Sequence, residues 1–438
     1  MVLMSVAILA TLLADLTFNT QVNKLRVYNR QDQLQAKYNA MAALNFGMIR
    51  LKLYKEARNY LEKNTKIKDF AKPEYLDMIW SMPFMMPLPM AERTDLVTKG
   101  MINDFQKNSL LQGELRLIMT NTSNLINLNL LRVTQATKDE SGQDDAEKER
   151  AQEDSKTKAS SSSGGDGDLI VNIEERLTEL LDNAIQSNLK ANEDFRAQYS
   201  NLDSKLLIKE LKYFISDPRS YDEPERSEME ARYRAKDISP KFAPLSSLLE
   251  LNLLDGWSHE IVDLIKNEVT VHGVIVIDLN RITQNTLKLL VPTISLEQSQ
   301  KFFKFRDDPE DPNYFNDLRD FRQYIVTKEA IITDSEFDSR MEKFQKAGIT
   351  FGTQGSLFKV LATGISGRAN TTITAWVSFP PKPAPVTTTK TSDTESAPQE
   401  NEEDNGFIQS PTTTSTKEKT ATPVIELLDP RIIELIVN

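Results

Sequence analysis

The chain has 438 residues, a formal net charge of −11, no cysteine and two histidines. The missing cysteines exclude disulfide bonds, zinc–thiolate sites and cysteine nucleophiles. The acidic balance argues against general nucleic-acid binding, which uses surfaces rich in lysine and arginine. A hydrophobic fraction of 39 % is sufficient for real cores, and the length allows two or three domains.

Residues 1–61 predict one continuous helix. No proline or glycine occurs before Gly47, and no charged residue occurs before Asp15. Beyond Asp15 the apolar residues recur at spacings of three and four, which is the period of an amphipathic helix. We therefore expect an apolar front end that enters a lipid bilayer and an amphipathic back end that packs on a globular body.

The apolar front end is shorter than the roughly 20 residues that a helix needs to cross a bilayer. Its basic residues Lys24, Arg26 and Arg30 follow the apolar run instead of preceding it, so the charge rule taken literally would place the body in the cytoplasm. The abrupt start, with methionine at positions 1 and 4, favours a natural start further upstream. A cleaved signal peptide is the alternative, although no A-x-A-like site follows.

The next segments differ sharply in composition. Residues 75–105 are rich in methionine and proline, which predicts a loop because proline blocks long helices. Residues 110–131 contain alternating and β-branched residues that predict one or two strands. Residues 134–168 and 380–423 are polar and rich in serine, threonine, glycine or proline, so we expect both tracts to be disordered and dispensable for folding.

The body between these two tracts mixes helix and strand signals. Helices are predicted near 170–187 and 203–216, followed by an acidic, proline-containing loop at 216–244. Shorter helices are predicted at 245–254, 258–269 and 282–326, the last in three pieces with N-caps at Thr283, Ser295 and Asn316. Strands are predicted at 270–280, and at 360–363 and 371–379 as a hairpin, while the apolar run 423–438 is expected to dock on the body or on a partner.

Catalytic signatures are missing from the sequence. It contains no H-E-x-x-H, G-x-S-x-G or Walker motif, and His259 and His272 are interpreted as structural histidines. One tract could bind a cation through oxygen ligands, with Asp217, Asp222 and Glu223 as the candidate calcium ligands. The alternative is a solvated acidic loop, because the spacing of an EF-hand is missing.

Several motifs occur in an order that resembles a known family. G-E-L-R-L-I is followed by N-L-N, then by A-P-L-S-S-L-L-E-L-N-L-L-D-G-W and by V-T-V-H-G-V-I-V-I-D-L-N-R-I-T. This order resembles the K-class minor pseudopilins of the bacterial type II secretion system. Residues 278–283 (DLNRIT) stand where that family has an N-I-N-T-A-like signature, with aspartate for the first asparagine. The resemblance covers the N-terminal helix and about residues 110–133 and 170–380.

The resemblance implies an α+β, pilin-like fold: a long N-terminal helix on an antiparallel sheet, interrupted by a large inserted α-helical domain. It divides the chain into a membrane and stalk helix (1–61), the first part of the pilin-like domain (62–133), a disordered insertion (134–168), the inserted α-helical domain (169–345), closing strands (346–379), a disordered linker (380–422) and a C-terminal apolar segment (423–438).

The implied function is structural instead of enzymatic. Family members initiate or cap a periplasmic pseudopilus together with minor pseudopilins of the I and J classes, are anchored in the inner membrane, and can bind calcium in the α-domain. A helix face bearing Val22, Leu34, Met41 and Met48 is then shared between the chain's own sheet and partner helices. Two alternatives stay open: a membrane-tethered helix-hairpin-helix DNA receptor, and a signal-anchored periplasmic enzyme.

Overall fold

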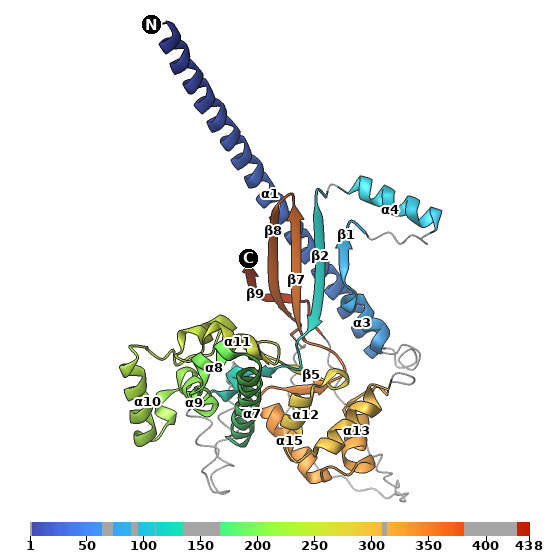
Figure 1. Ribbon diagram of the computed structural model, residues 1–438. Helices are drawn as coiled ribbons and strands as arrows, with labels where there is room; N and C mark the ends of the chain where they lie inside the picture. Colours follow the sequence, from blue (N-terminus) through green and yellow to red (C-terminus); the bar gives the residue numbers. More distant parts are fainter. Residues whose placement is uncertain are drawn as a thin grey trace, which may run out of the picture.

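The protein consists of a long helix, a five-stranded sheet on the C-terminal half of that helix, and a helical domain beyond one end of the sheet (Figure 1). This computed structural model describes residues 2–63, 73–88, 95–109, 111–134, 167–308, 313–380 and 427–438. The tracts predicted to be disordered, 134–168 and 380–423, lie almost entirely outside the described residues. The predicted arrangement, a long N-terminal helix on an antiparallel sheet interrupted by an inserted helical domain, is confirmed.

Helix α1 (Val2–Lys63) runs without interruption for 62 residues. Its N-terminal half projects away from the body (Figure 1), while its C-terminal half buries one face against the sheet. The buried face contains Ala36, Ala40 and Ala43, and it continues through Leu51 and Tyr54. These positions are three, four or eight residues apart, so they lie on one side of the helix.

The sheet has the strand order β1-β2-β7-β8-β9, and every neighbouring pair is antiparallel. Its strands are β1 (Phe84–Met86), β2 (Glu114–Asn121), β7 (Leu357–Ser366), β8 (Ala369–Ser378) and β9 (Arg431–Val437). Burial alternates along β2, β7 and β8, since one face of the sheet packs on α1. The predicted hairpin is β7–β8, and the C-terminal run joins the sheet as β9.

Small residues allow α1 to approach the sheet closely. Gly364 on β7 lies so near the helix that an added Cβ would be 2.0 Å from the carbonyl oxygen of Ala36 and 2.4 Å from the amide nitrogen of Ala40. On the helix, a Cβ added at Gly47 would meet the side chains of Leu117 and Val360 at 3.2 and 3.3 Å, a less severe contact. The resulting core contains the buried faces of β2, β7 and β8 together with α1 and Trp80.

The inserted domain lies between β2 and β7 and has a separate hydrophobic core. Its helices are η1 (Leu128–Leu131), α7 (Gly167–Ala191), α8 (Glu193–Tyr199), α9 (Ser204–Ile215), η3 (Pro218–Ser220), α10 (Glu223–Ala235), η4 (Leu248–Leu253), α11 (His259–Ile265), η5 (Leu279–Arg281), α12 (Gln284–Leu290), α13 (Leu296–Arg306), α14 (Leu318–Arg322), the π-helix η6 (Gln323–Lys328) and α15 (Asp334–Lys346). Two short parallel pairs complete it: β3 (Ile126–Asn127) with β4 (Val269–Thr270), and β5 (Val276–Asp278) with β6 (Thr350–Gly352).

Two segments that were predicted to be loops contain helices or strands instead, and in both the prolines were misinterpreted. The segment 75–105 contains α3 (Pro73–Ser81), β1 and α4 (Leu96–Asn108), and the acidic segment 216–244 contains η3 and α10. The prolines occupy the ends of these elements: Pro73 starts α3, Pro83 follows its end, and Pro224 lies in the first turn of α10. Proline at the first helical positions costs no hydrogen bond, so these residues delimit helices instead of preventing them.

Two smaller predictions also need correction. The single strand predicted at 270–280 is two short strands, β4 and β5, each with its own partner, because the chain bends at Val271 and His272 between them. The predicted caps Thr283 and Ser295 are confirmed by hydrogen bonds from the third helical amide. For α14 the N-cap is Asp317 instead of Asn316.

The close approach of α1 to β7 predicts that Gly364 tolerates no side chain. We expect Gly364→Ala to lower the free energy of unfolding by at least about 3 kcal/mol, because overpacking commonly costs about 1–3 kcal/mol and both clashing atoms here belong to the backbone. Urea denaturation monitored by circular dichroism measures the change.

Gly100→Ala is the matched control, since Gly100 lies inside α4 with no heavy atom within 4 Å of an added Cβ. Alanine is favoured over glycine in a helix by about 0.8–1 kcal/mol, so this variant should be unchanged or slightly more stable. Equal unfolding curves for the two variants would contradict the packing argument.

Candidate assembly surface on the N-terminal helix

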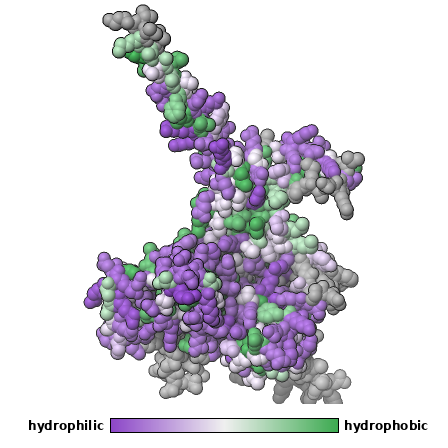
Figure 2. All heavy atoms as spheres, in the orientation of Figure 1, coloured by the Kyte–Doolittle hydropathy of each residue, from purple (hydrophilic) through white to green (hydrophobic). Residues whose placement is uncertain are grey.

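The projecting half of α1 carries exposed apolar side chains on all sides. Ile8, Leu9, Leu12, Leu16 and Phe18 are all more than half exposed. Figure 2 shows hydrophobic atoms along the free part of the helix and over the sheet, whereas the inserted domain is mostly hydrophilic on the same view. A search of the described helices finds none that combines the length and hydrophobicity needed to cross a membrane.

A second exposed apolar surface lies on the part of α1 that carries the sheet. Leu34, Tyr38, Met41 and Ile49 are 57 %, 64 %, 44 % and 62 % exposed, respectively. Their spacings of four, three and eight residues place them on one side of the helix, opposite the buried Ala36, Ala40 and Ala43. We call these four residues the apolar stripe.

The apolar stripe is large enough to matter energetically. Fully burying one large apolar side chain stabilises a complex by about 1.5–3 kcal/mol relative to leaving it in water. Long side chains spaced along one side of a helix are also the arrangement by which helices pack side by side. The stripe can therefore take a partner helix without disturbing the contact between α1 and its own sheet.

The structure places the four predicted face residues differently from one another. Leu34 and Met41 belong to the apolar stripe, while Met48 is half-buried and packs against the core of the sheet domain. Val22 is half-buried on the free part of the helix. Sequence reasoning missed Tyr38 and Ile49, although their spacing from Met41 would have indicated them.

The three candidate calcium ligands each have a structural position at the start of a helix. The Asp217 carboxylate accepts the backbone N–H of Arg219 at 3.0 Å and caps η3. Asp222 precedes α10, and Glu223 pairs with Arg226 at 2.9 Å. Within the described residues no three acidic or histidine side chains are grouped so that they could hold a metal ion. Calcium binding stays a prediction, which thermal melting with and without a chelator tests.

The motif at 278–283 forms the joint between the sheet and the inserted domain. Asp278 is buried, and its carboxylate accepts the side-chain N–H of Asn121 at 3.2 Å and the backbone N–H of Asn280 at 3.1 Å. The side chain of Asn124 pairs with the backbone of Asp278 in both directions, at 2.9 and 3.0 Å. Because Asn121 ends β2, these bonds fix where the inserted domain leaves the sheet.

The same motif also contacts α3, the helix that follows α1 in the chain. The Arg281 guanidinium binds the Asp77 carboxylate of α3 at 2.7 and 2.9 Å and lies over the Trp80 ring, 4.9 Å from its centroid. Arg281 therefore ties the inserted domain to the helix that follows the stalk. The position and direction of the apolar stripe relative to the inserted domain depend on this joint.

The comparisons with known proteins differ in outcome between sequences and solved structures. No protein-family model matches the chain, and no curated protein sequence does. Among solved structures, the fold is similar to a chain in the crystal structure of the GspK–GspI–GspJ complex from the type 2 secretion system of enterotoxigenic Escherichia coli. The TM-score is 0.44 at 13 % identity, over 81 % of this chain and 94 % of that chain.

The buried Asp278 predicts a measurable pH dependence of stability. Burial, and secondly the charge of Asp77, raise the pKa of Asp278 from 3.8 to about 6. The folded state therefore holds this proton more tightly than the unfolded state, so the contribution to stability is fully present below about pH 4 and is lost as the pH rises through 6. We expect Asp278→Asn to flatten the dependence of the unfolding free energy between pH 4.5 and 7.5.

Urea denaturation across this pH range measures the effect. Asp104→Asn, at an exposed carboxylate on α4, leaves the buried carboxyl in place and should follow the unmodified protein. Parallel profiles for Asp278→Asn and the unmodified protein would show that Asp278 does not titrate differently in the folded and unfolded states.

Proposed function

We propose that the chain is a non-enzymatic minor pseudopilin that initiates or caps a type II secretion pseudopilus for protein export across the outer membrane. In this proposal the free end of α1 lies in the inner membrane and the globular body lies in the periplasm. Support comes from the pilin-like architecture and from the ordered motifs that resemble the K class. The observation that carries the proposal is the apolar stripe, which leaves one side of α1 available to partner helices.

The geometry favours a terminal position in such a filament. A pilus grows when subunits pack their long helices side by side, with their heads stacked along the filament. In this chain the inserted domain lies beyond the end of the sheet, away from the free end of α1 (Figure 1). Its bulk would block a further subunit above the head, while the stripe and the free half of α1 accept neighbours at their sides and below.

The proposed partners are minor pseudopilins of the I and J classes. Their long helices would bury the apolar stripe, and the apolar residues of the free half of α1 would contact partner helices within the membrane. A chain with this role needs no catalytic group, since its effect comes from shape and from the apolar area that it buries.

Charged substitutions on the stripe test the proposal. We expect Tyr38→Glu and Met41→Glu each to reduce co-purification with the I- and J-class subunits at least about tenfold, because burying an unpaired carboxylate costs more than the 1.4 kcal/mol that a tenfold loss represents. Both side chains are exposed in the free chain, so circular dichroism should show a folded protein. Quantitative pull-down measures the loss.

Gln33→Glu is the matched control, as it introduces the same charge at an exposed position of α1 outside the stripe. It should retain the partners. Retention of partners by Tyr38→Glu and Met41→Glu would contradict the proposed interface. A soluble version without the first 20 residues gives a second test. If it binds neither the I-class nor the J-class subunit while those two subunits still bind each other, the proposed interface is also contradicted.

A further inference from the structure

A cavity lies between the sheet and the inserted domain, on the face of the sheet opposite α1. Its volume is about 350 Å³, and its walls come from the ends of β2, β7, β8 and β9 on one side and from residues 266–272 of the inserted domain on the other. A space of this size at a junction between domains is typical of sites for small ligands. Nothing in the proposed assembly function uses it.

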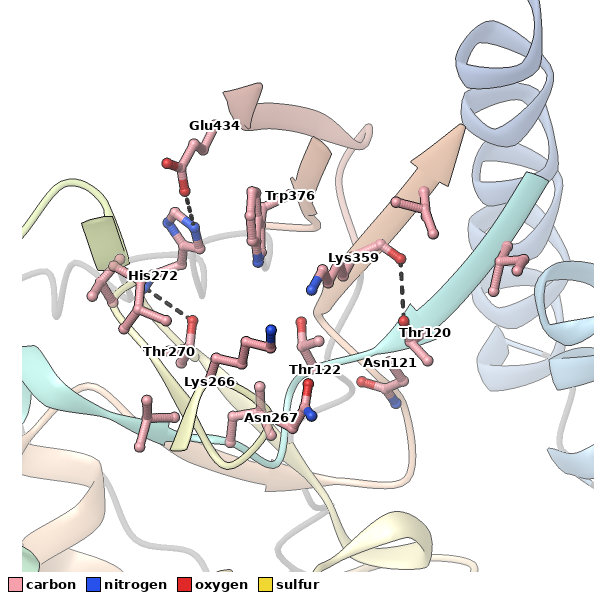
Figure 3. A pocket seen from close by; sticks show the side chains of 16 residues that line it. Thr120, Asn121, Thr122, Lys266, Asn267, Thr270, His272, Lys359, Trp376 and Glu434 are labelled. Atoms are coloured by element: carbon pink, nitrogen blue, oxygen red, sulfur yellow. Dashed lines mark hydrogen bonds and ion pairs between the residues drawn. The ribbon is translucent and has the colours of Figure 1, made fainter. Parts of the chain in front are cut away.

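Hydrogen-bond donors converge on this cavity. Figure 3 shows the ammonium groups of Lys266 and Lys359 pointing into it, with the nitrogen of the Trp376 ring and the Thr122 hydroxyl beside them. Lys359 lies over the Trp376 ring, with its Nζ 5.6 Å from the ring centroid. The four groups come from β7, β8, the end of β2 and the end of α11, so the joint between the domains assembles them.

Lys359 has no acidic partner among the residues that the structure describes, although it is only partly exposed. Burial, and secondly the charge of Lys266, lower the pKa of Lys359 below its usual value. Lys266 itself pairs with Asp263 at 2.9 Å. The indole N–H of Trp376 likewise has no acceptor within the described chain. Both side chains are partly exposed at the cavity, so an anion there could accept a hydrogen bond from each of them in place of water.

The one carboxylate in the cavity wall is already engaged. Glu434 of β9 binds Nε2 of His272 at 2.9 Å, and both side chains are largely buried. In Figure 3 the Glu434 carboxylate points to His272, on the far side of the Trp376 ring from Lys359. Glu434 therefore does not neutralise Lys359, whose charge stays available to a ligand.

We propose that this cavity binds a carboxylate ligand, with Lys359 and Lys266 as the cationic partners, the Trp376 N–H and Thr122 hydroxyl as further donors, and the indole ring as a flat wall. Charge-assisted hydrogen bonds to two ammonium groups give affinity for the anion. The aromatic wall favours a ligand with a flat apolar part. The proposal stands independently of the assembly function, because none of these residues lies on α1.

Binding is measured on the full chain labelled with 5-fluorotryptophan, whose three tryptophans give three fluorine resonances. Trp376→Phe identifies the resonance of Trp376. We expect benzoate to shift this resonance saturably and to leave those of the buried Trp80 and Trp257 unchanged. Benzamide, which has the same shape without the charge, should cause no saturable shift. Lys359→Met should weaken benzoate binding about tenfold or more, since it removes a charged partner but keeps the side-chain stem.

Lys346→Met is the matched control, because it removes the same charge from an exposed position on α15. It should leave benzoate binding unchanged. Equal saturable shifts with benzoate and benzamide, or unchanged benzoate binding in Lys359→Met, would each overturn the proposal.

A second pair of probes separates a free small carboxylate from an acidic side chain of another protein. The pair is acetyl-Ala-Glu-Ala-amide and its glutamine counterpart. Tighter binding of the glutamate peptide than of benzoate supports an acidic side chain as the natural ligand. Binding of benzoate without binding of the peptide supports a small free carboxylate. If neither benzoate nor the glutamate peptide binds saturably, the proposed site is overturned.

Discussion

The backbone contact between α1 and β7 is the constraint on which the arrangement of the molecule depends. Gly364 and the alanines of α1 bring helix and strand so close that no side chain fits between them. One side of the helix is then buried against the sheet, and the same domain cannot also cover the residues on the other side. Leu34, Tyr38, Met41 and Ile49 remain in solvent as a direct result. An apolar surface of this kind indicates an interaction site in soluble domains.

A second constraint acts where the inserted domain joins the sheet. Ser123, just after β2, accepts the backbone N–H groups of Ser356 and Leu357 at 2.7 and 2.9 Å. Gly355 passes so close to Asn121 that an added Cβ would lie 2.5 Å from its side-chain nitrogen. The chain passes between the sheet and the inserted domain twice, after β2 and before β7. Hydrogen bonds between buried polar groups hold these two segments together, and the bond from Asn121 to Asp278 is another of this kind. Such networks fix a geometry because each member would be costly to leave unpaired.

Much of the fold could be predicted from the sequence, because its strongest signals are local. The long helix, the β7–β8 hairpin and the amphipathic α7 and α9 follow from periodicity and turn residues. The errors arose at proline, which interrupts a helix in some positions and begins one in others. Pro224 was interpreted as part of a loop, yet it lies in the first turn of α10. Asp222 before α10, with Arg232 and Arg234 in its last turn, would have indicated that helix.

The candidate site was harder to predict, since it depends on which side of α1 meets the sheet. The side that meets the sheet bears Ala36, Ala40 and Ala43. A hydrophobic pattern does not distinguish such small side chains from other positions of the helix. Of the predicted face residues, Leu34 and Met41 are exposed opposite the sheet and Met48 packs against the core, while the exposed Tyr38 was not among those predicted. The cavity beside Lys359 could not be found from sequence at all, because its walls come from four strands and a loop that are distant along the chain.

The insertion of one domain between two paired strands has a consequence for the order of folding. Ser123 and Leu357 bond to each other although 234 residues separate them. A free chain of that length rarely brings its ends together, and long-range strand pairing is correspondingly slow. The inserted domain has its own core, so its folding shortens the effective loop to almost nothing. We expect the inserted domain to fold first and to deliver β7 to β2, with the sheet completed when β9 pairs with β8.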